Sequence, residues 1–381
     1  MPNEVKSAFG GKIKNYQPKV AIFYDWLNQW GGAEKVLLDI LKIFPNAQIF
    51  TLIHDPKKTD WLPKNIKINT SPLNKFPLAK KNNILYTPFY SIFLEQFDFS
   101  QYDIVISTTS TIGHSLLTPT NTLLICYFHN INRYLYQTPP QFKIISSLLK
   151  KYRKTDFIYG QRPDYLLCNS LTVQKRIESS YHRSAQIIHP GVDTTFFAPS
   201  QNNLTQEPYF LVVSRLVWHK RIDLAIKTCN QLNQKLIIVG EGRDKNKLIK
   251  IKNQNPKSKV IFFGHVSNKK LLFLYQNCQA LICPQIEDYG LSPLEAQACG
   301  KPVIAYKKGG ITETIINNKT GIFFPKQSVK SLSKAIKKFN PINFSTQDCL
   351  NNANRFSNQI FMLNFKQTID KLWQQHQTTL S

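Results

Sequence analysis

Short apolar runs alternate with longer amphipathic segments along the first half of the chain. The run from Val20 to Tyr24 ends at Asp25, and a helical pattern from Ala33 to Phe44 follows. Further runs that suit buried strands span residues 47–52, 103–107, 123–128 and 165–169, with a helix expected from residue 173. Buried strands that alternate with helices predict a parallel sheet covered on both faces.

The same pattern restarts after a polar, proline-bounded stretch at residues 199–208. Strands are expected at 209–213, 235–239, 260–263, 280–283 and 302–306, and a helix at 223–232. We therefore predict an α/β protein with two Rossmann-like, doubly wound parallel-sheet domains that face each other across a cleft. We place a flexible extension at residues 1–18, a first domain at 19–200 and a second at 201–357. A last helix, about residues 358–378, has an apolar stripe that can pack back on the first domain.

Composition fits a globular protein with a strongly basic surface. The 381 residues are 42% hydrophobic and 19% charged, and 49 basic against 23 acidic residues give a net charge of +26. Such a field attracts nucleic acid, anionic lipid or nucleotide diphosphates. Lysine that only keeps the surface soluble explains the charge equally well, so both interpretations stay open.

The cysteines and the chain start indicate a reducing compartment. None of the seven cysteines forms a C-x-x-C pair, so we expect small buried hydrophobic side chains and neither disulfides nor zinc ligands. Residues 1–18 are polar, without the apolar core of a signal peptide, and no apolar stretch approaches ~20 residues. We expect a cytoplasmic protein.

The strongest candidate site is the segment at residues 284–305. A strand ends at Cys283, a loop carries Gly290, and a helix is expected to begin near Ser292-Pro293. Free N–H groups at a helix start form an anion site. Glu287 in the loop and Glu295 in the expected first helical turn are spaced E-x(7)-E, so both can face one cleft. Alternatively, Glu295 only complements the helix dipole.

Two other turns follow first strands of the predicted domains. Arg215 and Lys220 come after the strand at 209–213 and can converge on a diphosphate, Arg as a planar fork and Lys as a point charge. The alternative is an ordinary exposed basic loop. Gly31-Gly32 follows the strand that begins at Val20 and allows close approach of a ligand, although a tight turn would also explain the pair.

These residues carry a resemblance to a known family. The E-x(7)-E block, Tyr24–Val36, Tyr209–Asp223 and Ile188–Asp193 together resemble glycosyltransferase family 4, the retaining enzymes of the GT-B fold. The chain is similar in particular to bacterial members that build O-antigen, capsular and exopolysaccharide chains. The resemblance runs from about residue 19 to about residue 361.

The resemblance implies roles for the residues singled out above. Arg215 and Lys220 would hold the donor diphosphate. Glu287 would approach the donor sugar, and Glu295 would hydrogen-bond the nucleotide ribose. After Gly290, the backbone at Leu291 and Ser292 would meet the phosphates, and Gly31 and Gly32 would let the first domain approach the diphosphate.

His129 occupies the position of a family histidine that contacts the transferred sugar. Together with Glu287, Arg215 and Lys220 it completes the expected catalytic set. A structural histidine at a strand end is the alternative. Relatives usually follow this histidine with Thr-Pro, whereas Asn130 and Ile131 follow here. His114 sits a few residues later than a second family histidine, so we carry no role onto it.

The resemblance implies transfer of a hexose, mannose the leading candidate, from a nucleotide diphosphate sugar to a hydroxyl of a growing glycan in cell-surface polysaccharide synthesis, such as lipopolysaccharide. The nucleotide sugar is a substrate, so no cofactor is expected, and the chain lacks an Asp-x-Asp, so no metal is required. Two alternatives stay open: a nucleotide-sugar 2-epimerase of the same fold, and a nucleic-acid-binding protein, for which no recognised motif is present.

A lipid-linked acceptor would require contact with the membrane. Residues 144–154 combine apolar side chains on one helical face with Lys150, Lys151, Arg153 and Lys154 at the expected helix end. Such a segment can lie on an anionic surface, which would make the protein peripheral on the inner membrane face. Alternatively, its apolar face packs on its own sheet.

Overall fold

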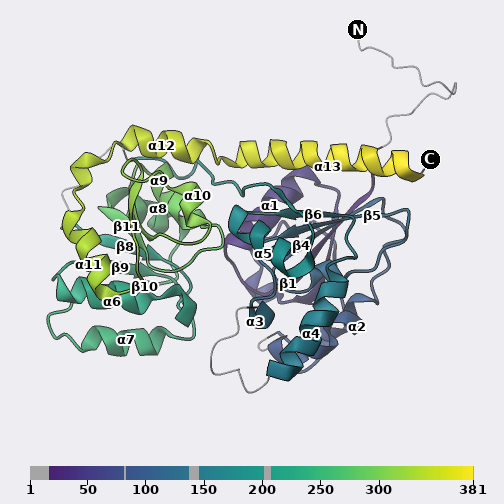
Figure 1. Ribbon diagram of the computed structural model, residues 1–381, viewed down its shortest axis with the longest axis horizontal. Helices are drawn as coiled ribbons and strands as arrows, with labels where there is room; N and C mark the ends of the chain where they lie inside the picture. Colours follow the sequence, from purple (N-terminus) through teal and green to yellow (C-terminus); the bar gives the residue numbers. More distant parts are fainter. Residues whose placement is uncertain (1–16, 81–82, 137–145, 201–206, 381) are drawn as a thin grey trace, which may run out of the picture.

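The computed structural model describes residues 17–80, 83–136, 146–200 and 207–380. The expected extension at residues 1–18 lies almost wholly outside these ranges, as do residues 201–206 of the expected linker. In the described ranges the chain builds two parallel sheets with helices around each (Figure 1). The predicted α/β architecture with two doubly wound sheets is thereby confirmed.

The first sheet has strand order β3-β2-β1-β4-β5-β6-β7, and neighbouring strands within it run parallel. Its strands are β1 (Val20–Leu27), β2 (Gln48–His54), β3 (Ile68–Thr70), β4 (Ile104–Thr109), β5 (Leu123–Phe128), β6 (Tyr165–Cys168) and β7 (Gln186–Ile187). The order reverses between β1 and β4, so the crevice where ligands bind opens at their carboxyl ends.

The second sheet repeats this topology with order β10-β9-β8-β11-β12-β13. Its strands are β8 (Phe210–Val213), β9 (Leu236–Val239), β10 (Val260–Gly264), β11 (Ala280–Cys283), β12 (Val303–Tyr306) and β13 (Gly321–Phe324). Its order reverses between β8 and β11, and the loops after these two strands contain the motifs with Arg215 and Glu287.

Helices follow most strands, as a doubly wound fold requires. Around the first sheet lie α1 (Gly32–Ile43), α2 (Tyr90–Leu94), α3 (Arg133–Tyr136), α4 (Ser146–Tyr159) and α5 (Leu171–Tyr181). The second unit has α6 (Ile222–Gln231), α7 (Lys245–Asn253), α8 (Asn268–Asn277), α9 (Leu291–Ala298), α10 (Ile311–Thr314), α11 (Val329–Lys338) and α12 (Thr346–Asn354). Short 3-10 segments are η1 (Pro56–Lys58), η2 (Pro72–Lys75), η3 (Asn83–Phe89), η4 (Gly113–Ser115), η6 (Trp218–Lys220) and η7 (Pro341–Asn343).

The last helix, α13 (Asn358–Leu380), returns from the second unit and lies along the first (Figure 1). Phe361, Phe365 and Ile369 are buried in the core cluster that also contains Val36 of α1 and Tyr127 of β5. The apolar stripe of α13 therefore completes the first domain's core and ties the two units together. None of the described helices is long and apolar enough to cross a membrane.

Candidate active site

The two switch points face each other, because the starts of α1 and α9 touch. A Cβ placed on Gly32, the first residue of α1, would lie 3.3 Å from the Cδ1 atom of Leu291, the first residue of α9. Both helices follow loops at the carboxyl ends of switch-point strands. The sequence motifs from both domains are thereby brought to one place.

Lys220 and Glu287 form an ion pair at the second switch point. The Lys220 ammonium donates to both carboxylate oxygens of Glu287, at 2.9 and 2.7 Å. Both side chains are largely shielded from solvent, with exposures of 16% and 13%. Gln285 Nε2 also donates to Glu287, at 2.5 Å. This ion pair joins the loop after β8 to the loop after β11.

The backbone of the Glu287 loop rests on a pair of glycines. Glu287 bridges to Gly309, and the N–H of Gly310 donates to the Glu287 carbonyl at 2.8 Å. A Cβ on Gly309 would lie only 2.2 Å from that carbonyl oxygen, and Gly309 has a φ of +92°. A larger residue at 309 would push the loop away, so glycine fixes where the Glu287 carboxylate points.

Helix α9 starts earlier than the sequence suggested. Gly290 has a φ of +102° and is the N-cap residue, so the helix begins at Leu291 and Pro293 is its third residue. Our placement of Glu295 in the first turn was wrong; the left-handed glycine starts the helix sooner, and Glu295 falls in the second turn. No side chain caps the helix start, so the N–H groups of Leu291 and Ser292 suit an anion.

Glu295 is buried, with 4% of its surface exposed, and has partners on both oxygens. Tyr275 donates its hydroxyl to Oε2 at 2.8 Å. Lys35 of α1, in the other domain, forms an ion pair with Oε1. Specific partners on both oxygens, one from across the cleft, go beyond what a carboxylate that only complements the helix dipole requires.

Behind the Gly31-Gly32 turn lies a buried acid. Glu34 accepts from the Tyr24 hydroxyl at 2.6 Å and from Gln29 Nε2 at 3.1 Å. Gly31 caps α1 without a side-chain hydrogen bond, and a Cβ there would lie 3.2 Å from Glu34 Oε2. Burial raises the pKa of Glu34 even though Tyr24 and Gln29 act against it. The buried Glu34 carboxylate therefore packs directly against the Gly31-Gly32 turn.

Arg215 reaches toward the first domain. Its Nη1 donates to Gln29 Oε1 at 3.3 Å, and the side chain is otherwise exposed. Burial, helped by the charges of Arg133, Lys220 and Arg215, lowers the pKa of nearby His219 to about 3. His219 is therefore neutral at pH 7, and its environment shows that cations from both domains gather at this point.

His129 lies at the carboxyl end of β5 with 8% of its surface exposed. Its backbone is held on both sides, by Thr109 O at 2.8 Å and Asn169 Nδ2 at 2.9 Å. Burial lowers the pKa of its imidazole to about 4. Its Nε2 is buried and has no hydrogen-bond partner among the described residues. A neutral ring with an unsatisfied nitrogen can serve a ligand hydroxyl.

Other polar side chains near the site were missed or given no role from sequence. Asp288, next to Glu287, binds Arg133 of α3 and Arg176 of α5, both from the first domain. His114, to which we assigned no role, is buried against Asp156 at 3.0 Å, away from these contacts. The sequence signal that could have found Asp288 is a second acidic residue directly after Glu287 in a chain with few acids.

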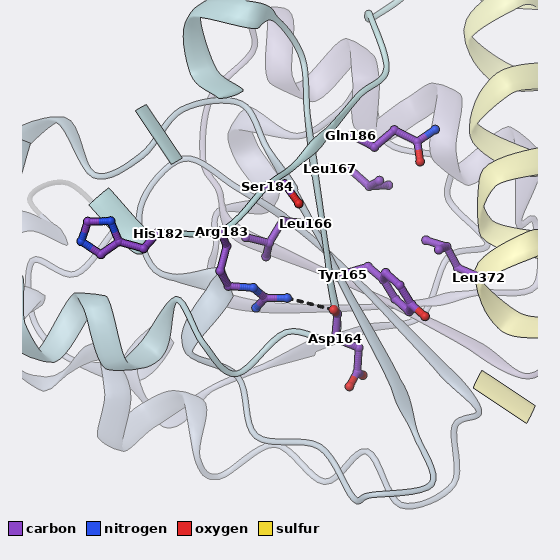
Figure 2. Close-up of a pocket in the computed structure, with 9 residues that line it drawn as sticks. All are labelled: Asp164, Tyr165, Leu166, Leu167, His182, Arg183, Ser184, Gln186 and Leu372. Carbon is purple, nitrogen blue, oxygen red and sulfur yellow. Dashed lines mark hydrogen bonds between the residues drawn. The ribbon is translucent and has the colours of Figure 1, made fainter. Parts of the chain in front are cut away.

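A cavity of about 460 Å³ lies elsewhere, at the β6–β7 edge of the first sheet (Figure 2). Arg183 lines it but donates to three backbone carbonyls, those of Gly160, Pro163 and Asp164. None of the predicted site residues lines this cavity.

Among the described residues, no group of three or more His, Cys, Asp or Glu side chains is placed to hold a metal ion. All seven cysteines are buried and free.

Comparison with known proteins finds similar glycosyltransferases. Residues 193–356 match the family model of glycosyl transferases group 1. An alpha-1,3/1,6-mannosyltransferase of Dictyostelium discoideum is 25% identical over 90% of this chain and 94% of its own length. A GDP-mannose-dependent alpha-(1-6)-phosphatidylinositol monomannoside mannosyltransferase of Mycolicibacterium smegmatis is 28% identical over 46% of this chain and 53% of its own length.

A solved structure shares the fold over almost the whole chain. HepE of Anabaena in complex with UDP superposes with a TM-score of 0.70 and 17% identity, covering 93% of this chain and all of that one (100%). The fold is therefore GT-B, and the family match and relatives show that the chain is a glycosyltransferase.

Proposed function

We propose that this glycosyltransferase moves a hexose, with mannose the leading candidate, from a nucleotide diphosphate sugar to a hydroxyl of a growing, lipid-linked glycan. The observation that carries this proposal is the meeting of the Lys220–Glu287 pair, Arg215 and the uncapped start of α9 at facing switch points. Two relatives that are named mannosyltransferases support mannose as the transferred sugar. The name of one of them describes it as GDP-mannose-dependent.

The charges in the cleft suit a diphosphate. The cations Arg133, Arg176, Arg215 and Lys220 stand against the carboxylates of Glu287 and Asp288. Four positive and two negative groups leave a net positive field for a dianionic diphosphate. We expect Arg215 and Lys220 to contact the phosphates, with the N–H groups of Leu291 and Ser292.

Bond breaking creates charge that these groups can stabilise. The sugar–oxygen bond breaks with its electron pair on the diphosphate, and the sugar becomes oxocarbenium-like. Cations and helix N–H groups already aimed at the leaving oxygens lower this barrier without reorganisation, as a divalent metal does in other enzymes. Because the chain resembles retaining enzymes, we propose that the acceptor hydroxyl attacks from the front face and preserves the anomeric configuration. Its oxygen forms the new bond to the sugar, and its proton passes to the departing diphosphate oxygen.

The remaining side chains would hold the sugar and the nucleoside. We assign Glu287 and the neutral Nε2 of His129 to hydroxyls of the transferred sugar. Glu295 would accept from the ribose, and Gly31 and Gly32 would leave room for the diphosphate. The buried, unpartnered His129 nitrogen favours a ligand contact over a purely structural role.

We propose that α4 contacts the membrane, but its basic residues lie elsewhere on the helix than the sequence suggested. Helix α4 continues to Tyr159, so the basic cluster lies in its middle and our placement at the helix end was wrong. Arg153 turns inward, donating to the Leu135 carbonyl at 2.7 Å. Lys150, Lys151 and Lys154 are exposed.

Beyond these lysines, the last turn of α4 exposes two apolar side chains, Phe157 at 37% and Ile158 at 61%. Ile144 and Ile145 and the side chains of Leu148 and Leu149 lie outside the described part of the chain. We propose that this surface holds the enzyme, as a cytoplasmic peripheral protein, on the anionic inner face of the membrane.

The direct test is a panel of nucleotide sugars with a polyprenyl-diphosphate-linked glycan as acceptor. We expect one donor, GDP-mannose first, to yield nucleoside diphosphate and a glycan one hexose longer. Conversion of the donor to its 2-epimer without transfer would show the epimerase activity instead. Release of nucleoside diphosphate from none of the donors would contradict the proposal.

A further inference from the structure

We propose that Asp288 is a positioning residue that clamps the two domains together and thereby sets Glu287 opposite His129. This inference rests on the proposed function, because Glu287 and His129 are the residues assigned there to the transferred sugar. It adds three residues to the machinery: Asp288 from the loop after β11, Arg133 from α3 and Arg176 from α5.

The Asp288 carboxylate is shared between two arginines of the opposite domain. Arg133 Nη2 lies 2.5 Å from Oδ2, and Arg176 Nη1 lies 2.5 Å from Oδ1. All three side chains are mostly shielded, with exposures between 20% and 28%. Charged hydrogen bonds on separate oxygens fix the carboxylate in two directions, which a single exposed pair would not do.

The backbone of Asp288 is held by the same two domains. Ser170, the N-cap residue of α5, donates its hydroxyl to the Asp288 carbonyl at 2.5 Å. On the other side, a Cβ on Gly310 would lie 2.2 Å from that carbonyl oxygen. The peptide therefore fits between α5 of the first domain and Gly310 of the second only while the domains stay together.

A continuous chain of contacts joins the clamp to both sugar-facing residues. Arg176 Nη1 also donates to Asn130 Oδ1 at 2.7 Å, and Asn130 directly follows His129. On the other side, Asp288 directly follows Glu287. The path from His129 to Glu287 thus runs through Arg176 and one carboxylate. Loss of that carboxylate would break this path, while the Ser170 hydroxyl would still donate to the Asp288 carbonyl.

The electrostatics keep this carboxylate charged. Burial alone would raise the pKa of Asp288, but Arg133 and Arg176 hold it below its ordinary value. Buried ion pairs contribute little to net stability on average, and their best-attested use is to specify one arrangement. The clamp is therefore better suited to fixing geometry than to stabilising either domain.

The test compares Asp288→Asn with Glu313→Gln. Glu313 is a matched control because it also crosses the domain boundary, accepting from the Leu171 N–H at 2.9 Å, but is remote in sequence from Glu287. We expect Asp288→Asn to lower kcat roughly 100-fold, as misplacement of reacting groups by about 1 Å does. Glu313→Gln should stay near the wild-type kcat. Nucleoside diphosphate affinity should hold or rise in Asp288→Asn, because one negative charge is lost and Arg133 and Arg176 are released from it. It should be unchanged in Glu313→Gln.

Companion variants separate positioning from folding. Arg133→Lys keeps the charge without the planar fork and should lose less kcat than Arg133→Gln. The losses of kcat in Asp288→Asn and Arg176→Gln should not add in the double variant, because both substitutions break the same ion pair. A wild-type kcat in Asp288→Asn, or an equal loss of nucleotide affinity, would overturn the inference.

A measurement that does not depend on catalysis can test the Asp288 clamp even if the proposed function is wrong. Small-angle scattering should show a larger radius of gyration for Asp288→Asn than for the wild type and Glu313→Gln. If the wild type transfers no sugar, the proposed function fails, and scattering still decides on the clamp. Equal radii in all three proteins would overturn it.

Discussion

The ammonium group of Lys35 in the first domain forms an ion pair with the carboxylate of Glu295 in the second. Tyr275 occupies the other carboxylate oxygen at 2.8 Å and is wholly buried. Lys35, with 31% of its side chain exposed, is the partner that is free to move. A ribose that binds Glu295 must therefore share an oxygen with Lys35 or displace it.

This relationship gives a matched pair of variants. Glu295→Gln removes the acceptor charge and should weaken nucleoside diphosphate binding by about 1.5–3 kcal/mol, the worth of a charged hydrogen bond. Lys35→Met removes the same ion pair but keeps the carboxylate, so its affinity should not fall. Calorimetry on both variants decides the matter. An equal loss in Lys35→Met would mean that Glu295 acts through domain pairing and not through the ribose.

Glu287 is predicted to act on the sugar and not on the nucleotide. Glu287→Gln should lower turnover on the order of 100-fold, as loss of an electrostatic contact to the transition state does. Free nucleoside diphosphate affinity should hold or rise, because Lys220 is released from its ion pair. Steady-state kinetics and calorimetry on one preparation test this. A loss of nucleotide affinity as large as that of Glu295→Gln would refute the division of roles.

His129 should make the fold sensitive to acid. Its pKa is about 4 when folded, against 6.5 for the free side chain, so the unfolded state takes up its proton first. Stability from the neutral ring is present above pH 6.5 and is lost as pH falls toward 4. Between pH 7 and pH 5 this amounts to about 2 kcal/mol.

Unfolding by denaturant at both pH values measures this effect. His129→Gln should lose less stability than the wild type between pH 7 and pH 5. The exposed His265 provides the control, and His265→Gln should behave as wild type. An identical pH response in His129→Gln and the wild type would show that the ring is not held neutral.

Membrane contact at α4 predicts a loss of binding that depends on charge position. Wild type should sediment with anionic vesicles and be released at high salt. Lys150→Ser, Lys151→Ser and Lys154→Ser together should weaken binding by about 1 kcal/mol for each cation. The control changes Lys247, Lys334 and Lys337, exposed lysines of the second domain, to Ser. Equal sedimentation of both triple variants would place the contact elsewhere on the basic surface.

Strands were predictable from the sequence where burial on both faces produces a continuous apolar run. The expected strands at 123–128 and 280–283 match β5 and β11 residue for residue. The strands β3, β7 and β13 were missed. They are two to four residues long and lie at sheet edges, so pairing with a neighbour defines them more than their own pattern does.

The candidate site was predictable only within each domain. Lys220 and Glu287 were each predicted in a loop after a strand of the second sheet. The structure pairs them because these two loops follow the switch-point strands and lie at one edge of the sheet. Lys35, Arg133 and Arg176 were not found as partners, since their contacts span 260, 155 and 112 positions. No local pattern specifies how two domains meet across a cleft.

Calorimetric titration of GDP and UDP into the wild type, Arg215→Ala and Lys220→Ala tests the nucleotide site most directly, with Lys247→Ala as the surface control. We expect the wild type and Lys247→Ala to bind one of the nucleotides equally well. Arg215→Ala and Lys220→Ala should each lose about 1.5–3 kcal/mol of binding free energy. Unchanged affinity in both Arg215→Ala and Lys220→Ala, or no binding of either nucleotide by the wild type, would contradict the assignment of this cleft to a nucleotide diphosphate sugar.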